Sequence, residues 1–170
     1  MPRNVRIKAP LIISKKELKF MFFRKEYSFL SNFHKVEIPF TFEGVEYIMP
    51  TSENAFQAMK VYASSSHPLR KAAWLRDVQE AAPEKAKILG RQLSIDRKAW
   101  DAMAEDKMLE IIRLKFAKGS QLAQELINLG DIDIVEDNNH GDKLWGRYAG
   151  KGENKLGKIL KQVQLELINS

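Results

Sequence analysis

The chain has 170 residues, about the length of one domain, and it contains no cysteine, which excludes disulfides, thiolate metal sites and a cysteine nucleophile. Its net charge is +6, but residues 1–20 carry six basic side chains against one acidic side chain, so nearly all of the excess lies at one end. We therefore divide the chain into a basic N-terminal arm, residues 1–19, and a near-neutral domain, residues 20–170. The arm is either a flexible tail, which we favour, or a segment that binds an anionic partner.

The N-terminal arm has no stretch that is typical of export or membrane insertion. Its longest apolar run is residues 9–13, and Pro10 interrupts that run. A secretory signal needs roughly 7–15 apolar residues, and a membrane helix needs roughly 20. We therefore expect a cytoplasmic protein with no membrane partner, and the sequence points to no obligate protein partner.

Strand patterns follow the arm. Apolar residues begin at Phe20 and alternate over residues 36–42 and 45–48, and the dipeptide Glu43-Gly44 between these two segments favours a hairpin turn. Pro39 lies inside the first segment. Because proline has no amide hydrogen to donate, this position indicates an edge strand or a bulge.

Helical patterns make up most of the remaining chain. Hydroxyl groups at residues 51 and 52 and prolines at 68 and 83 are typical of helix starts, whereas Gly119 and Gly130 are typical of helix ends. The sequence therefore predicts a mainly helical single domain of the α+β class with a small β element. The predicted helices cover residues 51–64, 68–78, 84–93, 96–118, 121–129 and 153–168, with a short strand at 132–135.

The first predicted helix, residues 51–64, carries one candidate site. At about 100° per residue, Glu53, Gln57 and Lys60 fall on one face of it. A carboxylate, an amide and an amine on one face could hold a polar small molecule. From the pattern alone, a solvated helix face with a capping acid is the favoured alternative.

A glycine-rich segment, residues 142–157, is the second candidate site. Three glycines precede the last predicted helix, and Arg147 and Lys151 add positive charge. Backbone amides in such a loop can approach a phosphate group, and a helix N-terminus favours an anion; a plain turn without a ligand is an equal alternative. Residues 152–158 also match part of a phosphate-loop motif, but we reject that interpretation because Ile159 follows instead of Ser or Thr and the stretch lies inside a helix.

The other polar and aromatic candidates are weak as single signals. The three histidines lie far apart, and His140, near Asp137 and Asp142, is more typical of a solvated loop than of a metal site. The acids over residues 131–137 are typical of a solvated sheet edge. Trp100 is more typical of a helix core than of a platform for base stacking, although an indole ring suits either place.

Short motifs along the chain occur together in one known family. In chain order they are 29–33 (FLSNF), 50–60 (PTSENAFQAMK), 89–91 (LGR), 100–101 (WD), 107–108 (KM), 114–116 (LKF), 134–136 (IVE), 142–146 (DKLWG) and 150–157 (GKGENKLG). By these motifs, which extend over about residues 26–168, the chain resembles the NADAR family of YbiA-like N-glycosidases. The residue after the motif glutamate is commonly His in the family and is Asn54 here, and Ile48 and Met49 are additional residues before the second motif.

This resemblance implies a mostly helical fold and an enzyme that hydrolyses the N-glycosidic bond between ribose C1′ and a base. Two substrate classes are associated with the family. One is the phosphorylated ribosylamino-pyrimidine intermediates of riboflavin synthesis, and the other is ADP-ribose attached to guanine in nucleic acid. The resemblance implies neither a metal nor a redox cofactor.

The same resemblance implies roles for individual residues. Cleavage of the C1′–N bond develops positive charge on the sugar, and we expect the Glu53 carboxylate to stabilise this charge or to activate water. Lys60 is the second catalytic candidate, because a lysine amine can attack C1′ of the opened sugar and form a Schiff base. The expected substrate-binding residues are Asn32, Gln57, Arg91, Trp100, Glu136, Asp142, Trp145, Gly146, Lys151, Gly152 and Asn154.

Two other classes of function are open from the sequence. The chain could bind ADP-ribose or another nucleotide without turning it over, or it could bind nucleic acid through the basic arm. Release of a free base distinguishes an enzyme from a binding module. Loss of salt-dependent DNA binding on deletion of residues 1–19 would identify an arm that binds nucleic acid.

Overall fold

The computed structural model describes residues 16–20 and 25–170, so the expected flexibility of the basic arm falls largely outside the described residues. At the end of the arm, strand β1 (Glu17–Phe20) pairs in parallel with strand β4 (Asp133–Asn138). An ion pair of 2.9 Å between Arg147 and Glu17 also links this segment to the C-terminal part of the chain. Residues 17–19, which we assigned to the arm, are therefore part of the folded structure.

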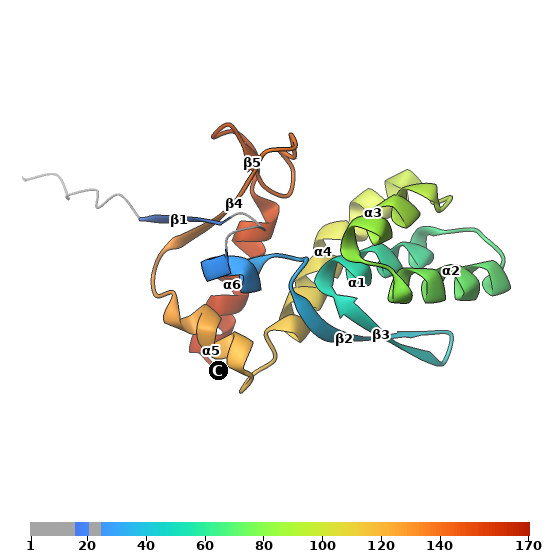
Figure 1. The fold of residues 1–170 in the computed structure, drawn as a ribbon, viewed down its shortest axis with the longest axis horizontal. Coiled ribbons are helices and arrows are strands. Elements are labelled where there is room, and N and C mark those ends of the chain that lie inside the picture. Colours follow the sequence, from blue (N-terminus) through green and yellow to red (C-terminus); the bar gives the residue numbers. More distant parts are fainter. Residues whose placement is uncertain (1–15, 21–24) are drawn as a thin grey trace, which may run out of the picture.

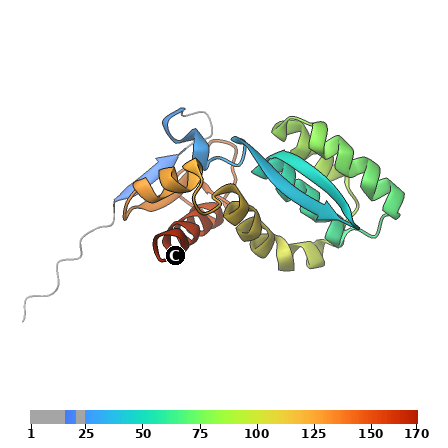
Figure 2. The ribbon, with the colours of Figure 1, turned by 90° about the horizontal axis from the view of Figure 1, so that it is seen from below.

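The elements form two groups along the long axis of the molecule (Figure 1, Figure 2). The first group contains β1, β4 and β5 (Arg147–Tyr148), which form one parallel sheet in the order β1-β4-β5. Helix α6 (Lys155–Ile168) packs against β4 of this sheet, and α5 (Gln121–Asn128) packs against α6. The C-terminal part of the chain and the N-terminal strand β1 thus form one layer of strands and helices.

The second group surrounds an antiparallel pair of strands, β2 (Lys35–Phe42) and β3 (Val45–Thr51). Helices α2 (Pro68–Glu80) and α3 (Pro83–Gln92) belong to the same group, and α4 (Arg97–Lys115) contacts both groups. Within the described ranges, no helix is both long and apolar enough to cross a membrane. The six α-helices and five short strands of the described residues confirm the predicted α+β class with its small β element.

The predicted hairpin is present between β2 and β3. Its two turn residues, Glu43 and Gly44, have φ values of 49° and 79°, which is the conformation of a type I′ turn. Pro39 is exposed and pairs with Ile48, and because the sheet has two strands, both of them are edges. The register also shifts between residues 35 and 38. Both features that Pro39 indicated, an edge and an irregular register, are found in this strand.

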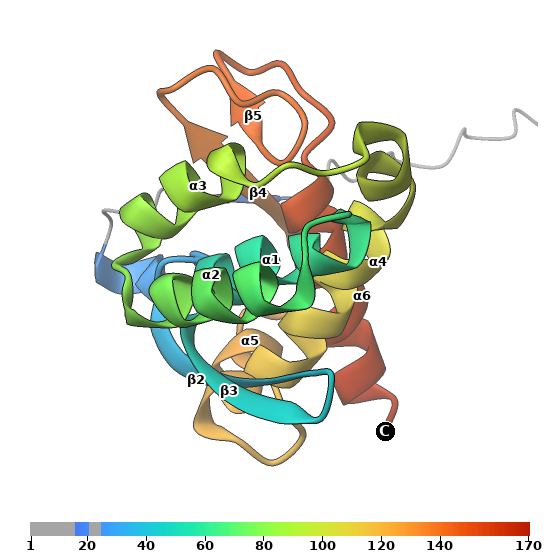
Figure 3. The same ribbon diagram turned by 90° about the vertical axis from the view of Figure 1, so that its right-hand side faces the viewer.

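The helix predicted over residues 51–64 divides into helix α1 (Ser52–Ala58) and a 3-10 helix, η2 (Met59–Ala63). The Thr51 side chain caps α1 by accepting a hydrogen bond of 3.1 Å from the Asn54 amide. All seven residues of α1 are buried, because β2, β3, α2, α3 and α4 all contact it (Figure 3). The favoured interpretation of a solvated helix face is therefore wrong, since the polar face of α1 points into the protein.

Asn54, which occupies the position where the family commonly has His, lies between α1 and α2. Its side-chain Nδ2 donates hydrogen bonds of 2.7 Å to the Val78 carbonyl and 2.8 Å to the Ala81 carbonyl. These bonds satisfy backbone acceptors at the end of α2, where the helix itself supplies no donors. Asn54 therefore fixes the packing of α1 on α2.

A buried lysine in α4 holds the segment that follows the 3-10 helix η1 (Lys25–Leu30). Lys115 is 2% exposed, and its Nζ donates a hydrogen bond of 2.7 Å to the Ser31 carbonyl. Burial lowers the pKa of Lys115 to about 7, because the charged ammonium loses its hydration. The unfolded chain keeps an ordinary lysine pKa near 10.4. The difference between the two pKa values lowers the free energy of unfolding at neutral pH.

This buried amine gives a testable dependence of stability on pH. Between about pH 7 and pH 10 the unfolded chain binds a proton at Lys115 that the folded chain does not hold, so this residue makes folding more favourable as pH rises. In the variant Lys115→Met this linkage is absent. We expect the unfolding free energy of the wild type, measured by urea denaturation, to rise relative to the variant from pH 7 to pH 10. An equal difference at both pH values would contradict the assignment.

Candidate active site

A cavity of about 550 Å³ lies where the two groups of elements meet. One side is lined by α1, η2, α3 and the start of α4, and the other side is lined by β4 and the loop that follows it. Nine of the thirteen predicted site residues line this cavity: Asn32, Glu53, Gln57, Lys60, Arg91, Trp100, Glu136, Asp142 and Trp145. The fold therefore brings together residues that are more than 100 positions apart in the sequence.

Glu53 and Gln57 form a hydrogen-bonded pair on α1. Glu53 is 6% exposed and Gln57 is 5% exposed, and Gln57 Nε2 donates a hydrogen bond of 2.7 Å to Glu53 Oε1. Burial raises the pKa of Glu53, while the positive charge of Lys87, the Gln57 amide and Lys60 act in the opposite direction. A carboxyl group in this setting holds a proton more readily than one in water.

Lys60 follows one turn later, in η2. Its Nζ donates a hydrogen bond of 3.1 Å to the Gly90 carbonyl and lies 5.8 Å from the centre of the Trp100 ring. Burial lowers the pKa of Lys60 to about 8, Glu53 opposes this shift, and nearby positive charges, including Arg91, strengthen it. A substantial fraction of this amine is therefore neutral near physiological pH, as a nucleophilic amine must be.

Glu136, in β4, brings a second desolvated carboxyl group to the cavity. Burial raises its pKa to about 7, and the negative charges of Asp142 and Glu53 add to the effect. The side chain of Asp142 has another task, because its Oδ1 accepts hydrogen bonds of 2.9 Å from the amides of Leu144 and Trp145. Asp142 thus orders the loop that places Trp145 on the cavity.

Three aromatic side chains form one wall of the cavity. The Phe56 ring lies 5.1 Å from the Trp100 ring and 5.2 Å from the Trp145 ring, measured between centroids. Tilted and edge-on contacts at these distances are favourable for aromatic pairs. Trp100 is therefore packed in the core and also exposes part of its surface to the cavity, so both of its predicted roles are compatible with the structure.

Several residues that line the cavity were missed in the sequence. Lys87 lies one helical turn before Arg91 on α3, and Arg97 lies in the first turn of α4, so three cations line the cavity together. The spacing of Lys87 and Arg91 was a usable signal, whereas nothing in the sequence linked Arg97 to them. The other missed residues are Ser31, Phe33, Phe56 and Met108, which lie within the quoted motifs, and His140 and Gly141.

Four predicted substrate-binding residues do not line the cavity: Gly146, Lys151, Gly152 and Asn154. Gly146 is buried against β4, where a Cβ atom would lie 2.6 Å from the Glu136 carbonyl oxygen. Gly152 has a φ of 146° and packs against the Gly146 carbonyl, and Lys151 is exposed and pairs with Tyr148 across the loop. The expected phosphate cradle is, in this structure, a loop whose glycines permit close backbone packing.

Asn154 lies outside the cavity and bonds the backbone of β4. It is buried at the start of α6, where its Oδ1 accepts a hydrogen bond of 3.0 Å from the Glu136 amide and its Nδ2 donates one of 2.9 Å to the Ile134 carbonyl. Both of its polar atoms are thus engaged by β4. The structure thus places Asn154 behind the cavity, where it fixes the strand that carries Glu136.

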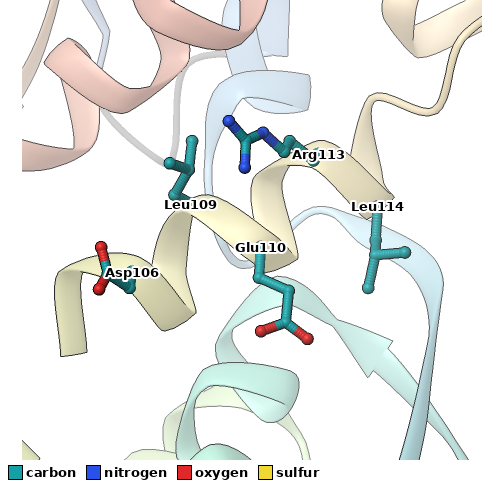
Figure 4. A pocket seen from close by; sticks show the side chains of 5 residues that line it. All are labelled: Asp106, Leu109, Glu110, Arg113 and Leu114. Carbon is teal, nitrogen blue, oxygen red and sulfur yellow. The ribbon is translucent and has the colours of Figure 1, made fainter. Parts of the chain in front are cut away.

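A second hollow, of about 520 Å³, runs along α4. Figure 4 shows that Leu109 and Arg113 extend on one side of the helix and Glu110 and Leu114 on the other. Arg113 is paired with Glu166 at 2.7 Å. None of the predicted site residues lines this hollow. Among the described residues, no group of three His, Asp or Glu side chains is arranged to hold a metal ion.

The cavity therefore combines three chemical features. An amine of lowered pKa and two carboxyl groups of raised pKa can act as nucleophilic and acid–base groups. The aromatic wall suits a planar ring, and the cations suit an anionic group such as phosphate. This combination fits group transfer at a ligand that has both a base and a phosphate.

Known proteins resemble this chain in sequence and in fold. The NADAR domain model matches residues 20–168. An N-glycosidase from Nostoc punctiforme is 34% identical over 150 residues, which are 84% of this chain and 87% of the relative. The N-glycosidase YbiA of Escherichia coli is 31% identical over 121 residues, or 69% of this chain and 70% of YbiA. A riboflavin biosynthesis protein from Vibrio vulnificus is 32% identical over 145 residues, and the match covers 84% of this chain but 36% of that longer relative.

The structural comparison finds a relative that the sequence comparison also finds. The NMR structure of E. coli YbiA matches this structure with a TM-score of 0.71 and 28% identity, over 99% of this chain and 94% of YbiA. The relatives named N-glycosidase are hydrolases by that name, so the prediction of a hydrolase family is confirmed. From the match to residues 20–168, these relatives and this fold, the chain belongs to the NADAR family, as its sequence motifs predicted.

Proposed function

We propose that the chain is an N-glycosidase that hydrolyses the C1′–N bond of a phosphorylated ribosyl compound. The observation that carries this proposal is the presence of the Lys60 amine and the Glu53 carboxyl group, both withdrawn from water, in one cavity with an aromatic wall. Relatives named N-glycosidase support the class of reaction. The steps below use the Lys60 amine, the Glu53 carboxyl group and water.

Lys60 acts as the nucleophile. A ribosylamine in its ring-opened form is an imine between C1′ and the leaving nitrogen, and the neutral Lys60 amine adds to C1′. A proton then moves from the Lys60 nitrogen to the leaving nitrogen, the bond between C1′ and the leaving nitrogen breaks, and a Lys60 imine forms. Water adds to this imine, which releases the sugar aldehyde and returns the Lys60 amine.

Glu53 moves the protons in this sequence. Its raised pKa allows the carboxyl group to give a proton to the leaving nitrogen, and the resulting carboxylate can take one from the attacking water. It is also close enough to Lys60 for each group to influence the pKa of the other. One carboxyl group can therefore serve both halves of the reaction, as acid first and as base second.

The remaining cavity residues bind the substrate. Trp100 and Trp145 contact the planar base, and the cations Lys87, Arg91 and Arg97 hold the phosphate. The name of the Vibrio relative favours a ribosylamino-pyrimidine phosphate as substrate, and ADP-ribose attached to guanine is the second candidate. Incubation with each compound, followed by mass spectrometry of the released base, identifies the substrate. Tight binding of both without release of a base would instead indicate a nucleotide-binding module.

Removal of either catalytic group tests the assignment of the site. We expect Glu53→Gln to lower kcat by roughly 10²-fold or more, because proton transfer is lost, and Lys60→Ala to reduce it at least as much. Lys85→Ala, which removes an exposed lysine of α3, is the matched control and should retain wild-type turnover. Circular dichroism establishes that each variant is folded. Wild-type turnover in both cavity variants would rule out this site.

The pH dependence of turnover tests the role of Lys60 separately. Only the neutral amine attacks C1′, so we expect kcat/KM to rise with pH through about 8. Arg91→Gln removes a positive charge that lowers the pKa of Lys60, so the same rise should occur at higher pH in that variant. A profile that stays level between pH 7 and pH 9 in the wild type would argue against a lysine nucleophile.

A further inference from the structure

A glycine in the last turn of α3 lies directly over the catalytic residues of α1 and η2. Gly90 is buried, and a Cβ atom at this position would overlap Gln57 Oε1 and lie 2.7 Å from Gln57 Cδ and 3.1 Å from Lys60 Nζ. The Gly90 carbonyl oxygen also accepts the hydrogen bond from Lys60 Nζ, at 3.1 Å. One residue outside the lining of the cavity thus contacts two side chains within it.

The backbone of α3 does not itself require glycine at this position. Gly90 is absent from the residues with positive φ, so its backbone conformation is one that alanine can also adopt. The need for glycine therefore comes from the space that the Gln57 amide occupies. A side chain as small as alanine would displace that amide.

The Gln57 amide, in turn, contacts Glu53. Its Nε2 donates the 2.7 Å hydrogen bond to Glu53 Oε1, while its Oε1 is buried over Gly90 without a hydrogen-bond partner among the described residues. A hydrogen bond thus holds one side of the Gln57 amide, and close packing on Gly90 holds the other side. If that packing is lost, the amide is free to turn. The orientation of the Glu53 carboxyl group therefore depends on the absence of a side chain at residue 90.

We propose that Gly90 and Gln57 are positioning residues, in which the space over Gly90 fixes the Gln57 amide and this amide holds the Glu53 carboxyl group beside the Lys60 amine. The inference rests on the proposed N-glycosidase function and assigns to the site a residue, Gly90, that does not contact substrate. It also replaces the expected substrate contact of Gln57 by a role within the protein.

The protonation of Glu53 should respond to this arrangement. The Gln57 hydrogen bond stabilises the charged carboxylate, so its loss raises the pKa of Glu53 further. The charged groups that act on Glu53 from the surrounding elements are Lys60 in η2, Lys87 in α3, Glu136 in β4 and Asp142 in the following loop. Lys87, Glu136 and Asp142 do not contact the changed atoms, whereas Lys60 Nζ would lie 3.1 Å from the new Cβ atom in Gly90→Ala.

The test is a double-mutant cycle on the full chain. We expect Gly90→Ala to lower kcat by about 10- to 100-fold with little change in KM, since a displaced catalytic group loses much of its effect. Gln57→Ala should cause a similar loss. In Gly90→Ala combined with Gln57→Ala, the new methyl group fills the space that the amide leaves, so we expect no more than about a threefold further loss. Losses that multiply would overturn the proposal, because the two residues would then act independently.

A second measurement does not depend on turnover. Carbon-13 NMR titration of the Glu53 carboxyl group, identified by its absence in Glu53→Gln, should give a higher pKa in Gly90→Ala and in Gln57→Ala than in the wild type, with the double variant equal to Gln57→Ala. An unchanged Glu53 titration in folded Gly90→Ala would overturn the proposal. If the wild type releases no base from any ribosyl compound but the titration shifts as expected, the proposed function fails and the positioning role stands.

Discussion

The burial of one short polar helix constrains the rest of this structure. Every residue of α1 is withdrawn from water, and buried polar groups need partners inside the protein. Asn54 finds its partners in the carbonyl groups at the end of α2, and Gln57 binds Glu53. The partners of Asn54 come from α2 and its end, the Gln57–Glu53 bond lies within α1, and the surrounding helices and strands exclude water from Glu53. The chemistry of the cavity thus follows from the packing of α1.

Local sequence patterns predicted most helices and strands. They did not predict which polar side chains would be buried, because burial depends on how the helices and strands pack together. Helical spacing placed Glu53, Gln57 and Lys60 on one face, but whether that face met solvent depended on α3 and α4. The glycines after residue 142 indicated close approach of the backbone, and the structure shows that the approaching group is β4 and the loop itself. Lys87 and Arg97 joined the cavity only through the relative positions of two helices, which no local pattern specifies.

The two buried lysine amines lower the stability of the folded protein at neutral pH. Lys60 and Lys115 both have lowered pKa values, so each disfavours the folded state at neutral pH relative to an exposed lysine. The hydrogen bond from Lys115 to the Ser31 carbonyl offsets part of this loss of stability. It also holds the segment in which Asn32 and Phe33 line the cavity. Lys60 has only the Gly90 carbonyl as a hydrogen-bond partner among the described residues. An amine that is desolvated at a cavity, and not deep in the core, is available to react.

The central claim is that Lys60 forms a covalent imine with C1′ of the substrate. Addition of borohydride during turnover reduces such an imine to a stable amine, and peptide mass spectrometry then locates the modified residue. We expect one adduct with the mass of the reduced ribosyl group, on Lys60, and none in Lys60→Ala. Release of the base with no adduct on Lys60, or with an adduct on another lysine, would contradict the account.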